Sequence, residues 1–476
     1  AIRAYYGLTN EIDSIEFLIS PIVEIYKDHY PDLHKNIDKI KKLYTTEENL
    51  FHKTLEKGTV EINRLIQDKE KFDEEKAFYL FETFGFPYEL TKEIAFENNI
   101  QLNDDKYMKK FQEHQAKSSA FKKETSNISE FDVDCNVFTG YENTNTISEV
   151  TLVLNENSTT TIFTEATPFY YEAGGQISDQ GSIVFEDKEY TVADVVQSSS
   201  GATGLVINED IKILSGEKIE SKVNESFRRS VSKSHTSAHI VHSSLRKILG
   251  DHVAQKGSLV SSDRLRFDFT NPKAIPDDTL LQIENDVQTM IEQSEPIQWD
   301  TVTLADARQA GAMMLFGEKY PDPCRMVSMG SFSRELCGGT HLTNTSQVES
   351  FEVVVEESVS TGTRRIEALT GQRAAEHRAQ THRMLDKIAD NLGCDPKQAL
   401  AAAVALMEEV RKLKKEIAAG KSSEHDSKFA FNGDGPTTDL SNYQSVRAAV
   451  RELTRRLNVA IHDIVQRIQS LLSDRE

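Results

Sequence analysis

In the stretch Ser234-His-Thr-Ser-Ala-His-Ile-Val-His242, the first two histidines, His235 and His239, are spaced four residues apart. The segment from 234 to 249 favours a helix ended by Gly250, which puts both imidazoles on one face about one turn apart. Further along the chain comes Cys337-Gly-Gly-Thr-His341, whose glycines allow a tight turn. Two or three imidazoles and one thiolate form a ligand set that suits Zn²⁺. Together the two pairs predict a zinc centre held by His235, His239, Cys337 and His341.

The residue after the first histidine restricts the chemistry of this centre. A zinc metalloprotease has Glu there as general base, whereas this chain has Thr236, so peptide hydrolysis is disfavoured. Four protein ligands are typical of a closed structural site, and catalytic zinc keeps one position open. A structural and a hydrolytic zinc are therefore both retained.

Three further motifs are candidates for substrate contacts. Gln255 begins Gln-Lys-Gly-Ser just after the histidine helix, and its amide offers a donor and an acceptor to a small polar substrate. Arg364 and Arg365 follow Gly362 and suit a phosphate, although a solvated basic pair explains them equally well. Gly174-Gly175-Gln176 permits a close backbone approach to a ligand, or simply makes a turn.

Changes in pattern along the chain predict a multidomain α+β protein. Residues 1–130 show helical periodicity, with Gly85 and Pro87 marking a turn between helices and a polar linker at 116–132. Regular short β-rich runs predict a small β-barrel over 131–225. Mixed helices and strands predict an α+β domain with the zinc over 226–370.

The last part of the chain is expected to be helical. Residues 371–418 contain a short heptad seam from Ala399 to Ile417, typical of a coiled coil, and we expect a linker at 419–445 and helix over 446–476. The apolar pattern of 382–417 returns at 446–473 with an offset of 65 residues. This indicates two similar helical units, with chance agreement of amphipathic helices as the alternative.

Charge is distributed unevenly over the 476 residues. The net charge of −21 speaks against a bulk nucleic-acid binder. Residues 226–260, however, hold six basic residues against one acid. This segment is interpreted as a local anion-binding surface, with a solvated helix face as the alternative, and Arg228, Arg229 and Lys233 as its predicted contacts.

The remaining composition bounds the class of protein. Four scattered cysteines argue against a disulfide scaffold and favour a reducing cytoplasm. The sequence has no run of about 18 apolar residues, so no membrane association is expected. The start Ala1-Ile2-Arg3 lacks Met and a signal pattern, so we expect the chain to begin partway through a longer protein.

The motifs quoted above, together with Leu265-Arg-Phe-Asp-Phe269, resemble the editing domain of alanyl-tRNA synthetases. Phe169-Tyr-Tyr-Glu-Ala-Gly-Gly-Gln176 is similar to the glycine motif of the β-barrel that precedes that domain. Phe84-Gly-Phe-Pro87 and the opening Ala1-Ile-Arg3 are similar to the helical tRNA-recognition domain. The resemblance covers about 1–418, and it departs at Phe81-Glu82, where the family usually has Tyr-Asp.

The resemblance implies an editing hydrolase that binds tRNA(Ala) and removes mischarged serine or glycine. It implies one zinc, with Gln255 and Cys337 at the catalytic site and tRNA held by Arg228, Arg229, Lys233, Arg364 and Arg365. The class II aminoacylation domain is expected to be absent from this chain, because it is either a separate chain or was removed. ATP is expected to be used only together with that domain.

Three other interpretations remain beside the editing hydrolase. One is a tRNA-binding and dimerising scaffold with a structural zinc, dimerising through the C-terminal helices. The others are an unrelated zinc hydrolase, which the family motifs disfavour, and a free-standing editing factor, which usually lacks a long helical N-terminal region.

Overall fold

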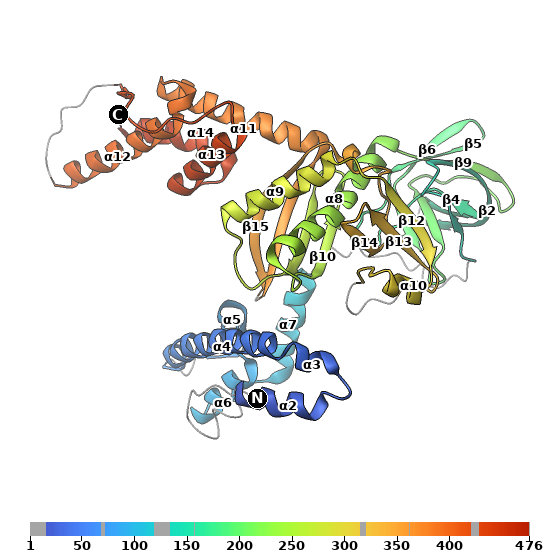
Figure 1. The fold of residues 1–476 in the computed structure, drawn as a ribbon, viewed down its shortest axis with the longest axis horizontal. Helices are drawn as coiled ribbons and strands as arrows, with labels where there is room; N and C mark the ends of the chain where they lie inside the picture. The colour runs from blue at the N-terminus through green and yellow to red at the C-terminus, as the bar shows by residue number, and fades with distance from the viewer. Residues whose placement is uncertain are drawn as a thin grey trace. The chain divides into compact units, whose positions relative to one another are not determined.

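The computed structural model describes residues 16–67, 72–118, 134–156, 158–314, 320–360, 362–419 and 428–475. The chain divides into two compact units, residues 1–126 and 127–476 (Figure 1). The expectations for Ala1-Ile2-Arg3 and for most of the 116–132 linker fall outside the described residues. In the described part of the chain, no helix combines the length and the apolar character that a membrane crossing requires.

The first unit is built from helices, as its periodicity predicts. They are η1 (Glu16–Leu18), α2 (Ile19–Tyr26), α3 (Pro31–Lys35), α4 (Ile37–Ile66), α5 (Glu74–Phe84), α6 (Tyr88–Glu97) and α7 (Asp104–Ser118). The predicted turn is present: Gly85 caps α5 in the left-handed conformation at φ 68°, and Pro87 precedes α6. Between them Phe86 is fully buried against Gly58 of α4, where a Cβ atom would lie 1.9 Å from its ring.

The second unit begins with a curled sheet of seven strands in the order β6-β5-β9-β2-β3-β8-β7. The strands are β2 (Asn145–Glu156), β3 (Thr159–Thr164), β5 (Gly181–Phe185), β6 (Lys188–Val192), β7 (Asp194–Gln197), β8 (Thr203–Ile207) and β9 (Lys218–Val223), and the short β1 (Val137–Phe138) pairs with β4 (Ala166–Thr167). The sheet curls enough to bring β6 into contact with β8 around a core that includes Phe169 and Ile183. The short β-rich runs predicted over 131–225 thus form one curled sheet.

The following α+β part consists of two sheets and two long helices. The sheets are β10-β11-β16-β15 and β12-β13-β14. Their strands are β10 (Gln255–Val260), β11 (Leu265–Thr270), β12 (Ile297–Val302), β13 (Cys324–Met329), β14 (Ser333–Leu336), β15 (Phe351–Ser360) and β16 (Thr363–Thr370), with helices α8 (Glu225–Leu249), α9 (Asp277–Glu292) and α10 (Leu304–Gln309) and the short η4 (Thr345–Val348).

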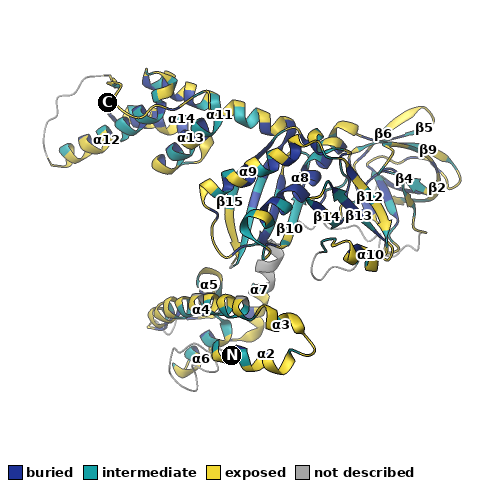
Figure 2. Cartoon of the chain, in the orientation of Figure 1, coloured by how far each residue is buried: buried dark blue, intermediate teal, exposed yellow. Residues whose placement is uncertain are grey.

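Helices α8 and α9 pack against each other and against the four-stranded sheet. Figure 2 shows α8 largely buried along this contact. The predicted helix over 234–249 ends where expected, but it begins nine residues earlier because the Asn224 side chain caps it by accepting a hydrogen bond from the Phe227 N–H.

The C-terminal helices form one bundle. Helix α11 (Gly371–Leu392), η5 (Pro396–Gln398) and α12 (Ala399–Ala418) are followed by α13 (Tyr443–Leu457), η6 (Ile461–Asp463) and α14 (Ile464–Arg475). The predicted coiled-coil segment is thus a hairpin of two helices. Its seam residues, such as Ala403 and Leu406, are buried within this bundle, and the expectation of a dimer through the C-terminal helices stays a prediction.

Part of the predicted linker at 419–445 also belongs to the bundle. Phe429, Phe431 and Leu440 pack against its core, and the Thr438 N–H donates to the Lys397 carbonyl at 2.8 Å. Residues 420–427 lie outside the described ranges.

Candidate metal centre

Helix α8 and the turn after β14 bring the four predicted ligands together. The candidate ligand atoms of His235, His239, Cys337 and His341 all lie within 4.8 Å of one another. The Cys337 Sγ lies 3.3 Å from the His235 Nε2 and 3.3 Å from the His341 Nε2. Ligands bound tetrahedrally to one zinc at about 2.0–2.3 Å stand roughly 3.5 Å apart, so the spacing fits that ion.

The turn itself requires glycine. A Cβ atom on Gly339 would lie 1.9 Å from the His235 ring, so a side chain there would displace a candidate ligand. The Arg325 guanidinium holds the turn in place, because it donates to the carbonyls of Cys337 and Gly339 at 2.9 Å each. It also lies over the Tyr141 ring at 4.0 Å, and the Tyr141 hydroxyl donates to the Gly338 carbonyl.

A second layer of polar groups faces the Nδ1 atom of each histidine ligand. Gln176 Oε1 lies 2.7 Å from His235 Nδ1, Glu335 Oε2 lies 3.5 Å from His239 Nδ1, and Thr236 Oγ1 lies 3.4 Å from His341 Nδ1. Metal-bound histidines are usually held by a hydrogen bond at Nδ1, which fixes the tautomer that presents Nε2 to the metal. Here His235 and His341 make such a bond, and the His239 contact with Glu335 is an ion-pair contact without hydrogen-bond geometry. Thr236, the residue that argues against a metalloprotease, thus supports His341.

Electrostatics favour a thiolate among these histidines. Burial raises the pKa of Cys337, but the adjacent His235 and His341 outweigh it and hold that pKa well below its usual range. Burial and the charge of His235 lower the pKa of His341 to about 3. Burial also opposes protonation of His239, yet the Glu335 carboxylate outweighs it and raises the pKa of His239 to about 9. A thiolate beside imidazoles is the donor chemistry that zinc takes.

Sequence reasoning missed most of this second layer. Gln176 was noted only as the end of a glycine turn, yet it is fully buried and comes from the loop between β4 and β5. The turn is held by main-chain bonds to β10, in which the Val260 N–H donates to the Gly175 carbonyl at 2.7 Å. The signal that the sequence offered was a glutamine directly after two glycines. Glu335 and Arg325 carried no recognisable pattern.

Gln255 lines a cavity of about 500 Å³ beside α8. Its other described lining residues include Gly174, Gly175, Ser258 and His242, and none of the four candidate metal ligands is among them. The structure therefore brings Gln255 and the glycine turn together, as residues of one cavity. The metal cluster is linked to this cavity through Glu335, which contacts both His239 and His242.

The predicted tRNA-contact residues are mostly engaged with carboxylates. The position of Arg228 speaks against the predicted tRNA contact. Its guanidinium is buried, pairs with Asp179 and donates to the carbonyls of Gly140 and Pro168. The other pairs join Lys233 to Glu349, Arg364 to Glu356 and Arg365 to Asp268. Of the five, Arg229 alone is classed as exposed.

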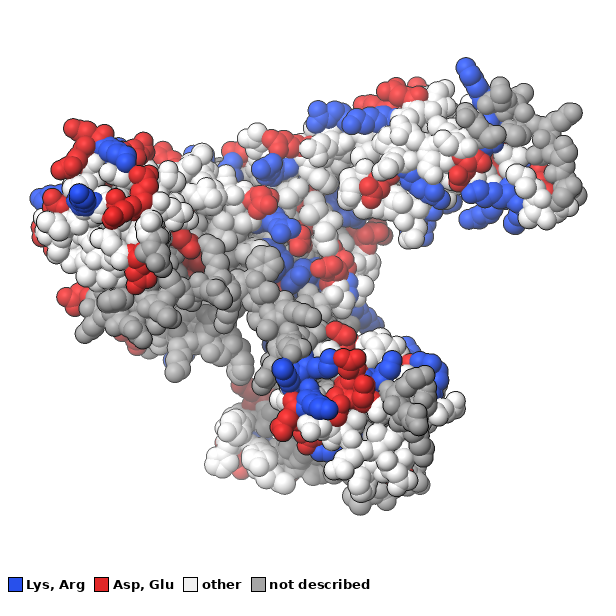
Figure 3. Space-filling model, turned by 180° about the vertical axis from the view of Figure 1, so that it is seen from behind, with Lys and Arg blue, Asp and Glu red and all other residues white. Residues whose placement is uncertain are grey.

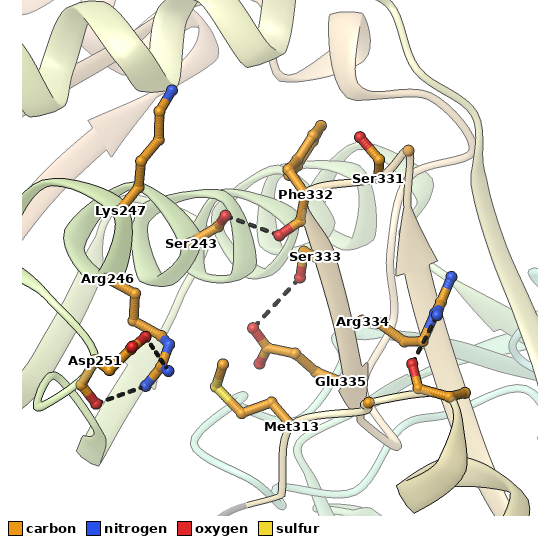
Figure 4. A pocket seen from close by; sticks show the side chains of 13 residues that line it. Ser243, Arg246, Lys247, Asp251, Met313, Ser331, Phe332, Ser333, Arg334 and Glu335 are labelled. Atoms are coloured by element: carbon orange, nitrogen blue, oxygen red, sulfur yellow. Dashed lines mark hydrogen bonds and ion pairs between the residues drawn. The ribbon is translucent and has the colours of Figure 1, made fainter.

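Two further basic residues of the segment 226–260 are similarly paired, whereas Lys256 is exposed and has no ion pair among the described residues. Figure 4 shows a second cavity, of about 390 Å³, in which Arg246 pairs with Asp251 and Lys247 points away from the cavity centre. Lys247 pairs with Asp286 of α9. Counting charges along the sequence overstated this surface, since the acidic partners come from other segments.

Comparison with known proteins agrees with this geometry. Residues 1–227 match the family model for class II (A) tRNA synthetases, and residues 324–367 match that of the threonyl and alanyl tRNA synthetase second additional domain. The chain is 44% identical to the alanine–tRNA ligase of Rhodopirellula baltica, over 96% of this chain and 52% of the relative. The chain belongs to the alanyl-tRNA synthetase family.

Other alanine–tRNA ligases show the same coverage. Those of Thermotoga sp. (strain RQ2) and Saccharophagus degradans are 36% and 33% identical, over 86% and 96% of this chain and 49% and 53% of the relatives. The chain thus spans about half the length of the alanyl-tRNA synthetase relatives it matches. The expectation that the class II aminoacylation domain is absent is wrong as stated, because residues 1–227 match the class II synthetase family model.

Proposed function

We propose that this chain is the part of an alanine–tRNA ligase that binds tRNA(Ala) and hydrolyses seryl- and glycyl-tRNA(Ala). The observation that carries the proposal is the cluster of His235, His239, Cys337 and His341 beside a cavity lined by Gln255. The four side chains would hold one zinc ion. Zinc, when bound, polarises an ester carbonyl or lowers the pKa of a coordinated water.

The cavity supplies the groups that an aminoacyl ester needs. Gln255 is half-buried, and its Nε2 donates to the Ser258 hydroxyl at 3.2 Å, so its amide oxygen is available to a ligand in the cavity. A site that hydrogen-bonds a seryl hydroxyl disfavours alanine, because alanine leaves those groups unpaired. Glycine is too small to be excluded from an aminoacylation pocket designed for alanine, which makes its removal by hydrolysis useful.

The surface proposed to hold the tRNA backbone is a groove on the C-terminal bundle. It lies among α12, α13 and α14 and is lined by five exposed cationic side chains over an apolar floor, of which Lys414 pairs with Asp474 and Arg456 pairs with Glu452. These are Arg411, Lys414, Lys415, Arg456 and Arg467. Figure 3 shows Lys and Arg side chains gathered on this bundle. Such a groove suits phosphates despite the net charge of −21. The Debye length is about 8 Å at physiological salt, so acidic residues farther away than this repel a phosphate only weakly.

A scaffold with a structural zinc is the second candidate function. Four protein ligands favour it, since catalytic zinc usually keeps a position open. For either function we expect the protein to act in the cytoplasm, which agrees with its four free cysteines.

Deacylation of seryl-tRNA(Ala), measured with and without a chelator, tests the proposal. Purified protein is expected to contain about one zinc per chain, to release serine from the tRNA, and to lose that activity on chelation. Zinc at this stoichiometry without any deacylation would favour the scaffold, and the absence of zinc would refute the metal centre.

A further inference from the structure

His242 is a third histidine on α8 that the metal cluster does not use. It follows His239 by three residues, is 1% exposed, and packs its ring against Phe267 with a centroid distance of 5.3 Å. Its Nδ1 lies 3.2 Å from the Glu335 Oε1. The same carboxylate contacts His239 through its other oxygen, so Glu335 holds both imidazoles.

The other nitrogen of His242 is the unusual feature. Its Nε2 is buried and has no hydrogen-bond partner among the described residues. His242 is also part of the wall of the 500 Å³ cavity that contains Gln255 and Gly174-Gly175. Buried polar atoms are nearly always paired, so an unpaired nitrogen at a cavity wall points to a group supplied by a ligand.

Glu335 decides which hydrogen-bonding role remains for that nitrogen. Its Oε1 faces the His242 Nδ1 and its Oε2 faces the His239 Nδ1, which is the arrangement of one carboxylate placed between two ring nitrogens. A carboxylate only accepts, so Nδ1 of His242 carries the hydrogen of the contact. In the neutral imidazole Nε2 is then an acceptor, and its complement is a hydroxyl.

We propose that His242 is a substrate-contacting residue whose Nε2 accepts a hydrogen bond from a hydroxyl of the aminoacyl-adenosine end. The inference rests on the proposed editing function. Two hydroxyls qualify by their chemistry, that of a seryl side chain and that of the terminal ribose. They are separable, because a glycyl ester has the ribose hydroxyl and lacks the seryl one.

Two matched variants separate the cavity contact from the Glu335 contact. In His242→Asn the amide takes the place of Nδ1 and reaches only toward Glu335. In His242→Gln the longer side chain takes the place of Nε2 and returns an acceptor to the cavity. The readouts are zinc content, thermal midpoint, and kcat/KM for seryl- and glycyl-tRNA(Ala).

We expect His242→Asn to keep zinc and fold but to lower kcat/KM by on the order of tenfold or more, and His242→Gln to restore most of it. Loss confined to the seryl ester identifies the side-chain hydroxyl, and equal loss with both esters identifies the ribose hydroxyl. Unchanged rates in His242→Asn would overturn the proposal. So would rescue by Asn rather than Gln, or loss of zinc in both variants, since each outcome assigns His242 a structural role beside Glu335.

A binding measurement keeps this inference separate from the proposed function. The probe is 3′-deoxy-3′-serylamino-adenosine, whose amide does not hydrolyse. If wild-type protein hydrolyses neither ester, the editing function fails, while weaker probe binding by His242→Asn than by His242→Gln would still support the contact. Equal binding of the probe by wild type and both variants would refute it.

Discussion

Gln176 reaches the metal-binding side chains from another part of the fold. It lies after Gly174-Gly175 in the loop between β4 and β5, and its Oε1 accepts a hydrogen bond from the Thr340 N–H at 2.9 Å as well as facing His235. Its Nε2 donates to the Thr340 hydroxyl at 2.9 Å. One amide therefore orients both a histidine ligand and the turn that bears Cys337 and His341, so the loop between β4 and β5 contributes to the metal centre.

Replacing Gln176 with Leu should weaken zinc binding by about 10–100-fold, because outer-shell partners of ligating histidines have effects of that size. Competition titration against a chromophoric chelator measures it. Gln197→Ala is the control, since Gln197 is an exposed glutamine of β7 that bonds only the Gly201 carbonyl among the described residues. If both variants bind zinc like the wild type, Gln176 does not orient His235.

At the scale of elements, the ion pair between α8 and the curled sheet is structural. Arg228→Met should destabilise the protein by about 3–5 kcal/mol, because it leaves the Asp179 carboxylate buried and unpaired. Arg229→Met, one position along the same helix, should change stability by less than about 0.5 kcal/mol. Denaturant unfolding compares the two, and similar effects would show that the Arg228 pair contributes little.

The C-terminal repeat is a clear case of what sequence could predict. Apolar spacing alone suggested two units offset by 65 residues, and the structure repeats the helix cap and the starts of the next two helices at that offset. The left-handed caps are Gly393 and Asn458, the short helices begin at Pro396 and Ile461, and the following helices begin at Ala399 and Ile464. Chance agreement of amphipathic helices does not account for matching caps.

The caps make a second prediction at this scale. Gly393 has φ 66°, so Gly393→Ala should cost about 1–2 kcal/mol of stability. Asn458→Gly, at φ 53° in the second unit, should be neutral or slightly stabilising, because glycine adopts this conformation freely. Glu408→Ala on the surface of α12 serves as the control, and thermal unfolding provides the measurement. A neutral Gly393→Ala would mean that the cap tolerates a side chain.

Other features escaped sequence reasoning for physical reasons. The metal ligands were predictable because a helix and a short turn fix their local spacing. The partners of Arg228, Arg365 and Glu335 were not, since each contact joins segments far apart in the chain. Strands β8 to β10 and β14 are short or carry polar residues on their exposed face, which hides their pattern.

At the scale of the second unit, the C-terminal bundle is joined to the α+β part by buried charges. Arg447 of α13 pairs with Glu284 of α9 and donates to the Val353 carbonyl of β15, and Glu352 accepts from the Tyr443 hydroxyl. The three charged groups of this contact, Glu284, Glu352 and Arg447, are all buried. The bundle is thus part of the same compact unit as the metal cluster, and a ligand held on its basic groove acts on one connected body.

The proposed tRNA contact in that groove has a salt-dependent signature. Arg411 and Lys415 are exposed, lie one turn apart on α12, and face the groove. Reversing both charges in Arg411→Glu/Lys415→Glu should lower tRNA affinity at least tenfold at physiological salt. It should also flatten the dependence of log Kd on log salt by about two contacts, because each neutralised phosphate contributes roughly 0.7–0.9 to that slope.

The matched control uses the same change of charge on the same bundle. Arg383 and Lys387 are exposed and one turn apart on α11, and neither lines the groove. Arg383→Glu/Lys387→Glu should lower affinity only through the altered net charge and should leave the salt slope near that of the wild type, since it removes no phosphate contact. Filter binding across a salt series with tRNA(Ala) measures both quantities. Equal slopes for the two double variants would place the tRNA backbone elsewhere on the protein, with exposed Arg229 as the next residue to test.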